Sequence, residues 1–127
     1  MKKTEIRTNK APLPAGPYSQ AVRNGDLLFV SGTLPIDPSN NTISQDIAKA
    51  TLLIFNHIDN ILAEAGTDKS KILKTTIFMK DLSNFAEVNK LYANYFEGTS
   101  IMPARSTIQV AKLPLDAPVE IELIVTF

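Results

Sequence analysis

Residues 119–127, the last nine of the chain, alternate between two kinds of side chain. The odd positions hold Val119, Ile121, Leu123, Val125 and Phe127, and the even positions hold Glu120, Glu122, Ile124 and Thr126. A period of two places the odd residues on one face of a β-strand and the even residues on the other. The chain must therefore form a sheet in which this strand is half-buried, with an apolar layer against one face.

Four further segments have the features of strands. Residues 20–23 and 27–31 flank an Asn-Gly-Asp turn at 24–26, and Asn-Gly is a strong hairpin signal because it tolerates positive φ. Residues 72–80 and 105–112 mix β-branched and other apolar residues with polar ones, as strands do. We predict a hairpin near the N-terminus and two more strands before the last one.

Two segments have the periodicity of amphipathic helices. The first follows Ser44, a suitable N-cap, and ends before Gly66, a common terminator, while the second is capped by Asp81 or Ser83 and runs through Glu97. The apolar stripes are Ile47, Thr51, Ile54, Ile58, Ile61 and Ala65 in the first helix, and Phe85, Val88, Tyr92, Tyr95 and Phe96 in the second. Aromatic stripes at helical spacing are usually core, so we expect both helices to pack on the sheet.

The order of these elements, a hairpin and then helix, strand, helix, strand and strand, predicts an α+β fold with both helices on one face of the sheet. The length suits a single domain, 1–127. On the other face, Ile77, Met79 and Ile124 are too apolar to stay in water, and no third helix is left to cover them. We therefore expect a second copy of the chain to cover this face in a homo-oligomer.

Composition excludes several classes of function. The chain has no cysteine, which rules out disulfides, thiolate metal sites and a cysteine nucleophile. Thirteen basic residues balance thirteen acidic ones, so a small molecule is a more suitable ligand than nucleic acid or an anionic membrane. The single histidine, His57, has no partner at metal-ligand spacing, so we expect no metal and place His57 at the surface or flank of its helix. The chain shows neither a phosphate-binding glycine loop nor an apolar run typical of a signal peptide or membrane span, which predicts a cytoplasmic protein without a cofactor.

Arg105 is the strongest candidate for a binding residue. Its strand pattern places a guanidinium on a polar face, and this planar fork of donors suits a carboxylate or a phosphate. Two interpretations stay open: Arg105 holds an anionic ligand, or it forms a structural ion pair with Glu120 or Glu122. Loop 11–18 contains three prolines, so it is rigid and presents Tyr18 at a defined place.

Five short motifs are informative when they are taken together. They are Gly16–Ala21 (GPYSQA), Val30–Gly32 (VSG), Asn89–Tyr92 (NKLY), Pro103–Ser106 (PARS) and Val119–Ile121 (VEI). The set closely resembles the reactive-intermediate deaminase family, also called RidA or YjgF, and the match runs from about residue 11 to residue 126. The resemblance implies a chorismate-mutase-like fold with a mixed β-sheet, assembled as a homotrimer with three clefts between subunits.

The resemblance also implies an activity. Family enzymes hydrolyse 2-imino acids, derived from 2-aminoacrylate or 2-aminocrotonate, to 2-keto acids and ammonia. On this basis Arg105 holds the substrate carboxylate, Glu120 orients or activates a water, and Tyr18 closes the cleft through its hydroxyl. Ser31 and Gly32 resemble family positions that line the cleft.

Thr107 departs from the family pattern, because several active members have cysteine at this position. Period two puts Thr107 on the same strand face as Arg105, so its hydroxyl or backbone can still contact the ligand. Imine hydrolysis needs water and not a thiol, so we expect activity to persist. Asn89, on the polar side of its helix, is expected to be structural.

Two other functions are compatible with the same residues. One is a trimeric sensor or chaperone that binds 2-keto acids without turnover, since Arg105 serves either role. The other is an endoribonuclease that represses translation, a role attached to relatives of this family. Balanced charge and aromatic residues assigned to the core disfavour the nuclease.

Overall fold

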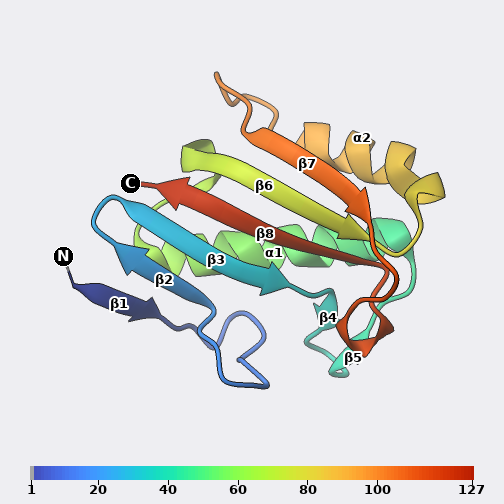
Figure 1. Ribbon diagram of the computed structural model, residues 1–127, viewed down its shortest axis with the longest axis horizontal. Coiled ribbons are helices and arrows are strands. Elements are labelled where there is room, and N and C mark those ends of the chain that lie inside the picture. Colours follow the sequence, from blue (N-terminus) through green and yellow to red (C-terminus); the bar gives the residue numbers. More distant parts are fainter. Residues whose placement is uncertain (1) are drawn as a thin grey trace.

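The computed structural model describes residues 2–127, which form a six-stranded sheet in the order β1-β2-β3-β8-β6-β7 and a small two-stranded hairpin. The strands of the sheet are β1 (Lys3–Ile6), β2 (Ala21–Asn24), β3 (Leu27–Thr33), β6 (Ile72–Met79), β7 (Ala104–Gln109) and β8 (Val119–Thr126). The hairpin is β4 (Ile36–Asp37) with β5 (Thr42–Ile43), and the helices are α1 (Ile47–Ala65) and α2 (Phe85–Tyr95). Both helices lie behind the sheet in Figure 1, so the predicted α+β fold is confirmed.

The sheet is mixed because α2 crosses over between two of its strands. Strands β6 and β7 are parallel, and β6 also pairs antiparallel with β8, so β6 lies between the last two strands of the chain. Strand β7 consequently forms one edge of the sheet (Figure 1). Within residues 2–127, no helix is both long enough and apolar enough to cross a membrane.

The core lies between the sheet and the two helices. Alternate residues of β8 are buried as the period of two predicts: Val119, Ile121, Leu123 and Val125. They meet buried residues of both helices, among which are Ile54, Ile58, Leu62, Val88, Tyr92 and Phe96. The aromatic stripe of α2 is therefore core, and the expected packing of both stripes is confirmed.

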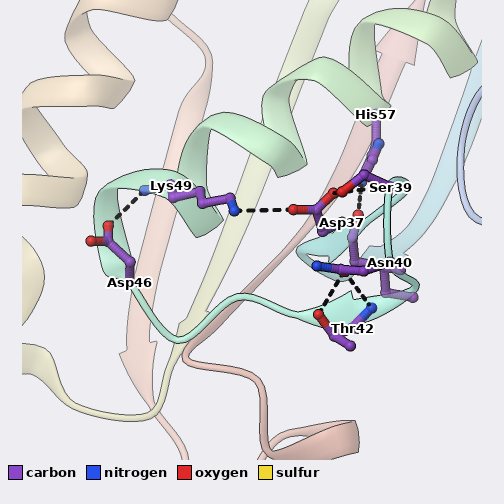
Figure 2. Close-up of polar contacts among 8 residues, drawn as sticks. Asp37, Ser39, Asn40, Thr42, Asp46, Lys49 and His57 are labelled. Carbon is purple, nitrogen blue, oxygen red and sulfur yellow. Dashed lines mark hydrogen bonds and ion pairs between the residues drawn. The ribbon is translucent and has the colours of Figure 1, made fainter.

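The helix ends differ in detail from the prediction. Asp46, not Ser44, caps α1, and its Oδ1 accepts a hydrogen bond of 2.9 Å from the backbone N–H of Lys49 (Figure 2). Gly66 ends α1 as predicted, in the left-handed region at φ 86°. Asp81 caps a short 3-10 turn, Leu82–Asn84, and α2 follows it and ends at Tyr95, two residues before the predicted limit.

Part of the open face of the sheet is apolar, but its apolar residues are not all the predicted ones. Ile77 and Met79 are fully buried beneath the helices, so their placement on the open face was wrong. The open face instead carries Phe29, Phe78, Ile108 and Ile124, of which Phe29 and Ile108 are exposed. Alternation identifies which residues of β6 share a face, but it does not say which face the helices cover.

The prediction for His57 was also wrong, because the side chain is buried with 1% of its surface exposed. The β4–β5 hairpin, which the sequence pattern did not indicate, packs over the helix here, and His57 Nε2 lies 2.8 Å from the carbonyl oxygen of Ile36. An ion pair of 3.0 Å between Lys49 and Asp37 joins the hairpin to α1.

Candidate functional site

A pocket of about 570 Å³ opens where β3 and β8 meet the loop before β2. Residues that line it include Tyr18, Ser31, Gly32, Leu115, Glu120 and Glu122. Glu120 packs directly on the backbone of Gly32, because a Cβ at position 32 would lie 2.7 Å from the Glu120 carboxylate. A glycine is therefore needed there for the carboxylate to keep its place.

The loop that carries Tyr18 is held by a buried amide. Gln20 accepts a hydrogen bond of 2.8 Å from the backbone N–H of Thr8 and donates to the carbonyl oxygen of Pro12 at 2.8 Å. Ser31 Oγ donates to the Ser19 carbonyl oxygen at 2.6 Å, which ties the loop to β3. Tyr18 itself remains 51% exposed at the pocket. Sequence reasoning missed the anchoring role of Gln20, although the residue belongs to the GPYSQA motif.

The environment of Glu120 makes its carboxylate a stronger proton acceptor. Burial raises the pKa of this carboxyl above its ordinary value, and the nearby charge of Glu122 raises the pKa further. A raised pKa makes a carboxylate a better general base near neutral pH. None of the residues within 2–127 that line the pocket is basic, so the pocket has a base but no cation to hold an organic acid.

Arg105 lies on the other face of the sheet, beside α2. It pairs in register with the buried Thr75 of β6, and its Nη1 donates a hydrogen bond of 2.7 Å to Asn89 Oδ1. The guanidinium carbon lies 4.8 Å from the centre of the Tyr92 ring and 5.4 Å from that of Phe85. These contacts orient the guanidinium, so Asn89 contributes to the candidate site and is more than a helix-surface residue.

Thr107 shares this face with Arg105, as predicted, since it pairs with the buried Ile77. Its Oγ1 is buried and has no hydrogen-bond partner within residues 2–127. A buried hydroxyl without a partner is unfavourable by about 1–3 kcal/mol. This hydroxyl is therefore a candidate contact for a ligand held by Arg105.

The predicted site residues thus fall into two groups on opposite faces of one chain. Tyr18, Ser31, Gly32 and Glu120 share the pocket on the open face, whereas Arg105 and Thr107 lie on the helix face. Within residues 2–127 of one chain, Arg105 forms no ion pair with Glu120 or Glu122, and its Nη1 bonds to Asn89. Arg105 and Glu120 are also on strands that are not neighbours, since β6 separates β7 from β8.

The described residues contain no group of side chains suited to holding a metal ion. Within 2–127, no three side chains of histidine, cysteine, aspartate or glutamate gather closely enough for that purpose.

Solved structures of small Rid-type proteins share this fold of a mixed sheet backed by two helices. A protein of the conserved Rid family from Yersinia pestis has a TM-score of 0.95 and 46% identity, covering 99% of this chain and 100% of that one. Escherichia coli TdcF with bound serine has a TM-score of 0.92 and 36% identity, covering 98% of each chain.

The family model described as Endoribonuclease L-PSP matches residues 8–127, and the chain belongs to this family, which is the RidA/YjgF family predicted from the motifs. A RutC family protein of Aquifex aeolicus is 44% identical over 120 residues, 94% of this chain and 96% of the relative. The chloroplastic Reactive Intermediate Deaminase A of Arabidopsis thaliana is 44% identical over 127 residues, 99% of this chain and 67% of the relative.

Proposed function

We propose that this protein hydrolyses reactive 2-imino acids to 2-keto acids and ammonia at sites formed between copies of the chain. The observation that carries the proposal is the division of the candidate site. One face has an oriented cation, Arg105, without a base, and the other has a base, Glu120, without a cation. Two copies that bring these faces together make one complete site, and the site is incomplete in a single copy.

The chemistry of each group fits this reaction. Arg105 binds the substrate carboxylate through its guanidinium nitrogens and fixes the imine carbon C2 in one place. Glu120 accepts a proton from a water whose oxygen bonds to C2, the C=N π bond opens, and Glu120 passes this proton to the nitrogen. The C–N bond of the resulting carbinolamine then breaks, ammonia leaves, and C2 keeps the oxygen as a ketone. The net reaction consumes one water and needs no oxidant or reductant.

The assembly that we propose is a homotrimer, as the family resemblance implies. The apolar open face supports an assembly of this kind, since Phe29 and Ile108 would otherwise be in water. The cytoplasm, where dehydratases release imines from serine and threonine, is the proposed location. A small imino or keto acid is the proposed ligand.

The decisive experiment adds the protein to a threonine dehydratase reaction and follows the release of 2-ketobutyrate. Wild-type protein should accelerate the release, and Arg105→Ala should lower kcat/KM by about 100-fold or more because the substrate is no longer oriented. Arg7→Ala is the matched control, since Arg7 is an exposed arginine before β2 and belongs to neither group of candidate site residues. An Arg105→Ala variant that folds, assembles and accelerates the release like wild type would rule out the proposal.

A second candidate, binding of a small acid without turnover, is favoured by one observation: a structural neighbour of 36% identity was solved with bound serine. Glu120→Gln distinguishes the two functions. For an enzyme, the variant should still be stabilised thermally by 2-ketobutyrate but should lose hydrolysis. For a binding protein, wild type itself should be stabilised by the keto acid and show no hydrolysis.

A further inference from the structure

Leu115 has a backbone conformation that is unfavourable for its residue type. Its φ is 57° and that of the following Asp116 is 54°, so two consecutive non-glycine residues lie in the left-handed region. Each such residue is strained by about 1–3 kcal/mol, and strain of this kind persists only where the surroundings impose it. Both residues belong to the short turn Pro114–Asp116, which leads into β8.

The surroundings impose this conformation through contacts to Asp116. Its carboxylate forms an ion pair of 3.2 Å with Lys80, at the end of β6, and its carbonyl oxygen accepts a hydrogen bond of 3.0 Å from Gln45 Nε2. The backbone N–H of Asp116 donates to the Leu113 carbonyl oxygen at 3.0 Å. These contacts hold the turn but leave the Leu115 side chain 66% exposed, so packing does not explain why the residue is apolar.

The side chain of Leu115 lies between two cavities. It lines the 570 Å³ pocket that contains Glu120 and Tyr18. It also lines an adjoining cavity of about 70 Å³, whose walls include Leu13, Leu34, Ile36 and Ile61. Tyr18, Gly32 and Leu34 line both cavities, so the two cavities adjoin. A ligand held beside Glu120 therefore has an apolar recess within reach.

We propose that Leu115 is a specificity-determining residue that selects 2-imino acids with a short apolar side chain, which enters the recess beside Glu120. This inference rests on the proposed imine hydrolysis and names the substrate class of the same site. The imine carbon lies at the Glu120 end, and the apolar substituent on C2 extends past Leu115. A hydrophobic recess discriminates by about tenfold or more for each methylene group that it accepts.

The test compares a series of imino acids that an L-amino acid oxidase generates from alanine, 2-aminobutyrate, norvaline and leucine, with catalase present. Leu115→Asn keeps the branched shape and tolerates the left-handed conformation, but it makes the wall polar. Leu115→Gly removes the side chain and the backbone strain together, so this variant should remain folded. Leu52→Asn is the matched control, because Leu52 is an exposed leucine on α1 away from both cavities.

For both Leu115 variants, we expect kcat/KM for the norvaline and 2-aminobutyrate imines to fall by about tenfold or more relative to the alanine imine, chiefly through KM. The control should keep the wild-type order of substrates. If wild type hydrolyses these imines and both Leu115 variants keep its order of preference, the role of Leu115 is overturned while the proposed function stands. If wild type accelerates none of the imines, the proposed function fails and the inference fails with it.

Discussion

His57 shows how the fold sets the chemistry of a single residue. The ring is buried, and Nε2 lies 2.8 Å from the Ile36 carbonyl oxygen, which can only accept a hydrogen bond. Nε2 therefore carries the proton of the neutral ring. Burial lowers the pKa of His57 below the ordinary value of 6.5, and the Ile36 carbonyl and the charge of Asp37 counteract this only in part. The folded protein thus favours the neutral form of its single histidine.

A pH dependence of stability follows from this lowered pKa. Around and below pH 6.5 the unfolded chain binds a proton on His57 more readily than the folded chain does, so the free energy of unfolding should fall as the pH decreases from 7 to 5. Above pH 7 the His57 contribution should be constant. Urea unfolding at pH 8, 7, 6 and 5 measures the effect.

The matched variant for this measurement is His57→Gln, because an amide can donate to Ile36 and does not titrate. Asp37 does not interfere, since hydrogen bonds from Ser39 and Lys49 hold its pKa at about 2, below the range tested. The difference in unfolding free energy between wild type and the variant should change with pH. A constant difference from pH 8 to pH 5 would contradict the assignment.

At the scale of elements, the start of α1 depends on one carboxylate. The chain reads Ser44-Gln45-Asp46 in this segment, and two of these residues, Ser44 and Asp46, are favoured N-caps by type. The structure selects Asp46, whose side chain accepts from the Lys49 N–H at 2.9 Å. The backbone N–H of Ser44 instead donates to the Pro35 carbonyl oxygen, which keeps Ser44 in the loop after β5.

Replacing the cap should therefore have a larger effect than replacing its neighbour. Asp46→Ala is expected to lower the free energy of unfolding by about 1 kcal/mol, because one N–H of the first helical turn loses its partner. Ser44→Ala, two residues earlier, should change it by less than about 0.5 kcal/mol. Urea unfolding at pH 7 measures both, and equal losses in the two variants would refute the assignment of the cap.

At the scale of the whole molecule, the division of the site between two faces makes a prediction about mixtures. Arg105→Ala and Glu120→Gln should each be inactive alone. In mixed trimers that contain both variants, about one third of the sites should combine a wild-type Arg105 with a wild-type Glu120 from another copy. Imine hydrolysis should recover to about that fraction of the wild-type rate per site.

Purification through different tags on the two variants ensures that the assemblies tested are mixed. Assemblies of two differently tagged Arg105→Ala chains serve as the control and should stay inactive. Mixed assemblies that remain as inactive as either parent would show that Arg105 and Glu120 do not act together across copies. Sedimentation of each sample should give the mass of the assembly, for which we propose a trimer.

Local patterns in the sequence were sufficient to predict several elements of this protein and its family. The alternation in 119–127, the Asn-Gly turn at 24–26 and the aromatic stripe of α2 each depend on residues close together in the chain, and each prediction is confirmed. The short motifs identified the family, because they combine residue types at spacings that chance rarely produces.

Only the tertiary structure decided how the strands are combined. A period of two assigns side chains to the two faces of one strand, but it does not say which strand lies beside it or which face the helices cover. The crossover through α2 makes β6 the neighbour of both β7 and β8, and pairing across β6 then puts Arg105 on the helix face and Glu120 on the open face. The burial of His57 likewise depends on the β4–β5 hairpin packing on α1, a contact between segments that no local pattern specifies.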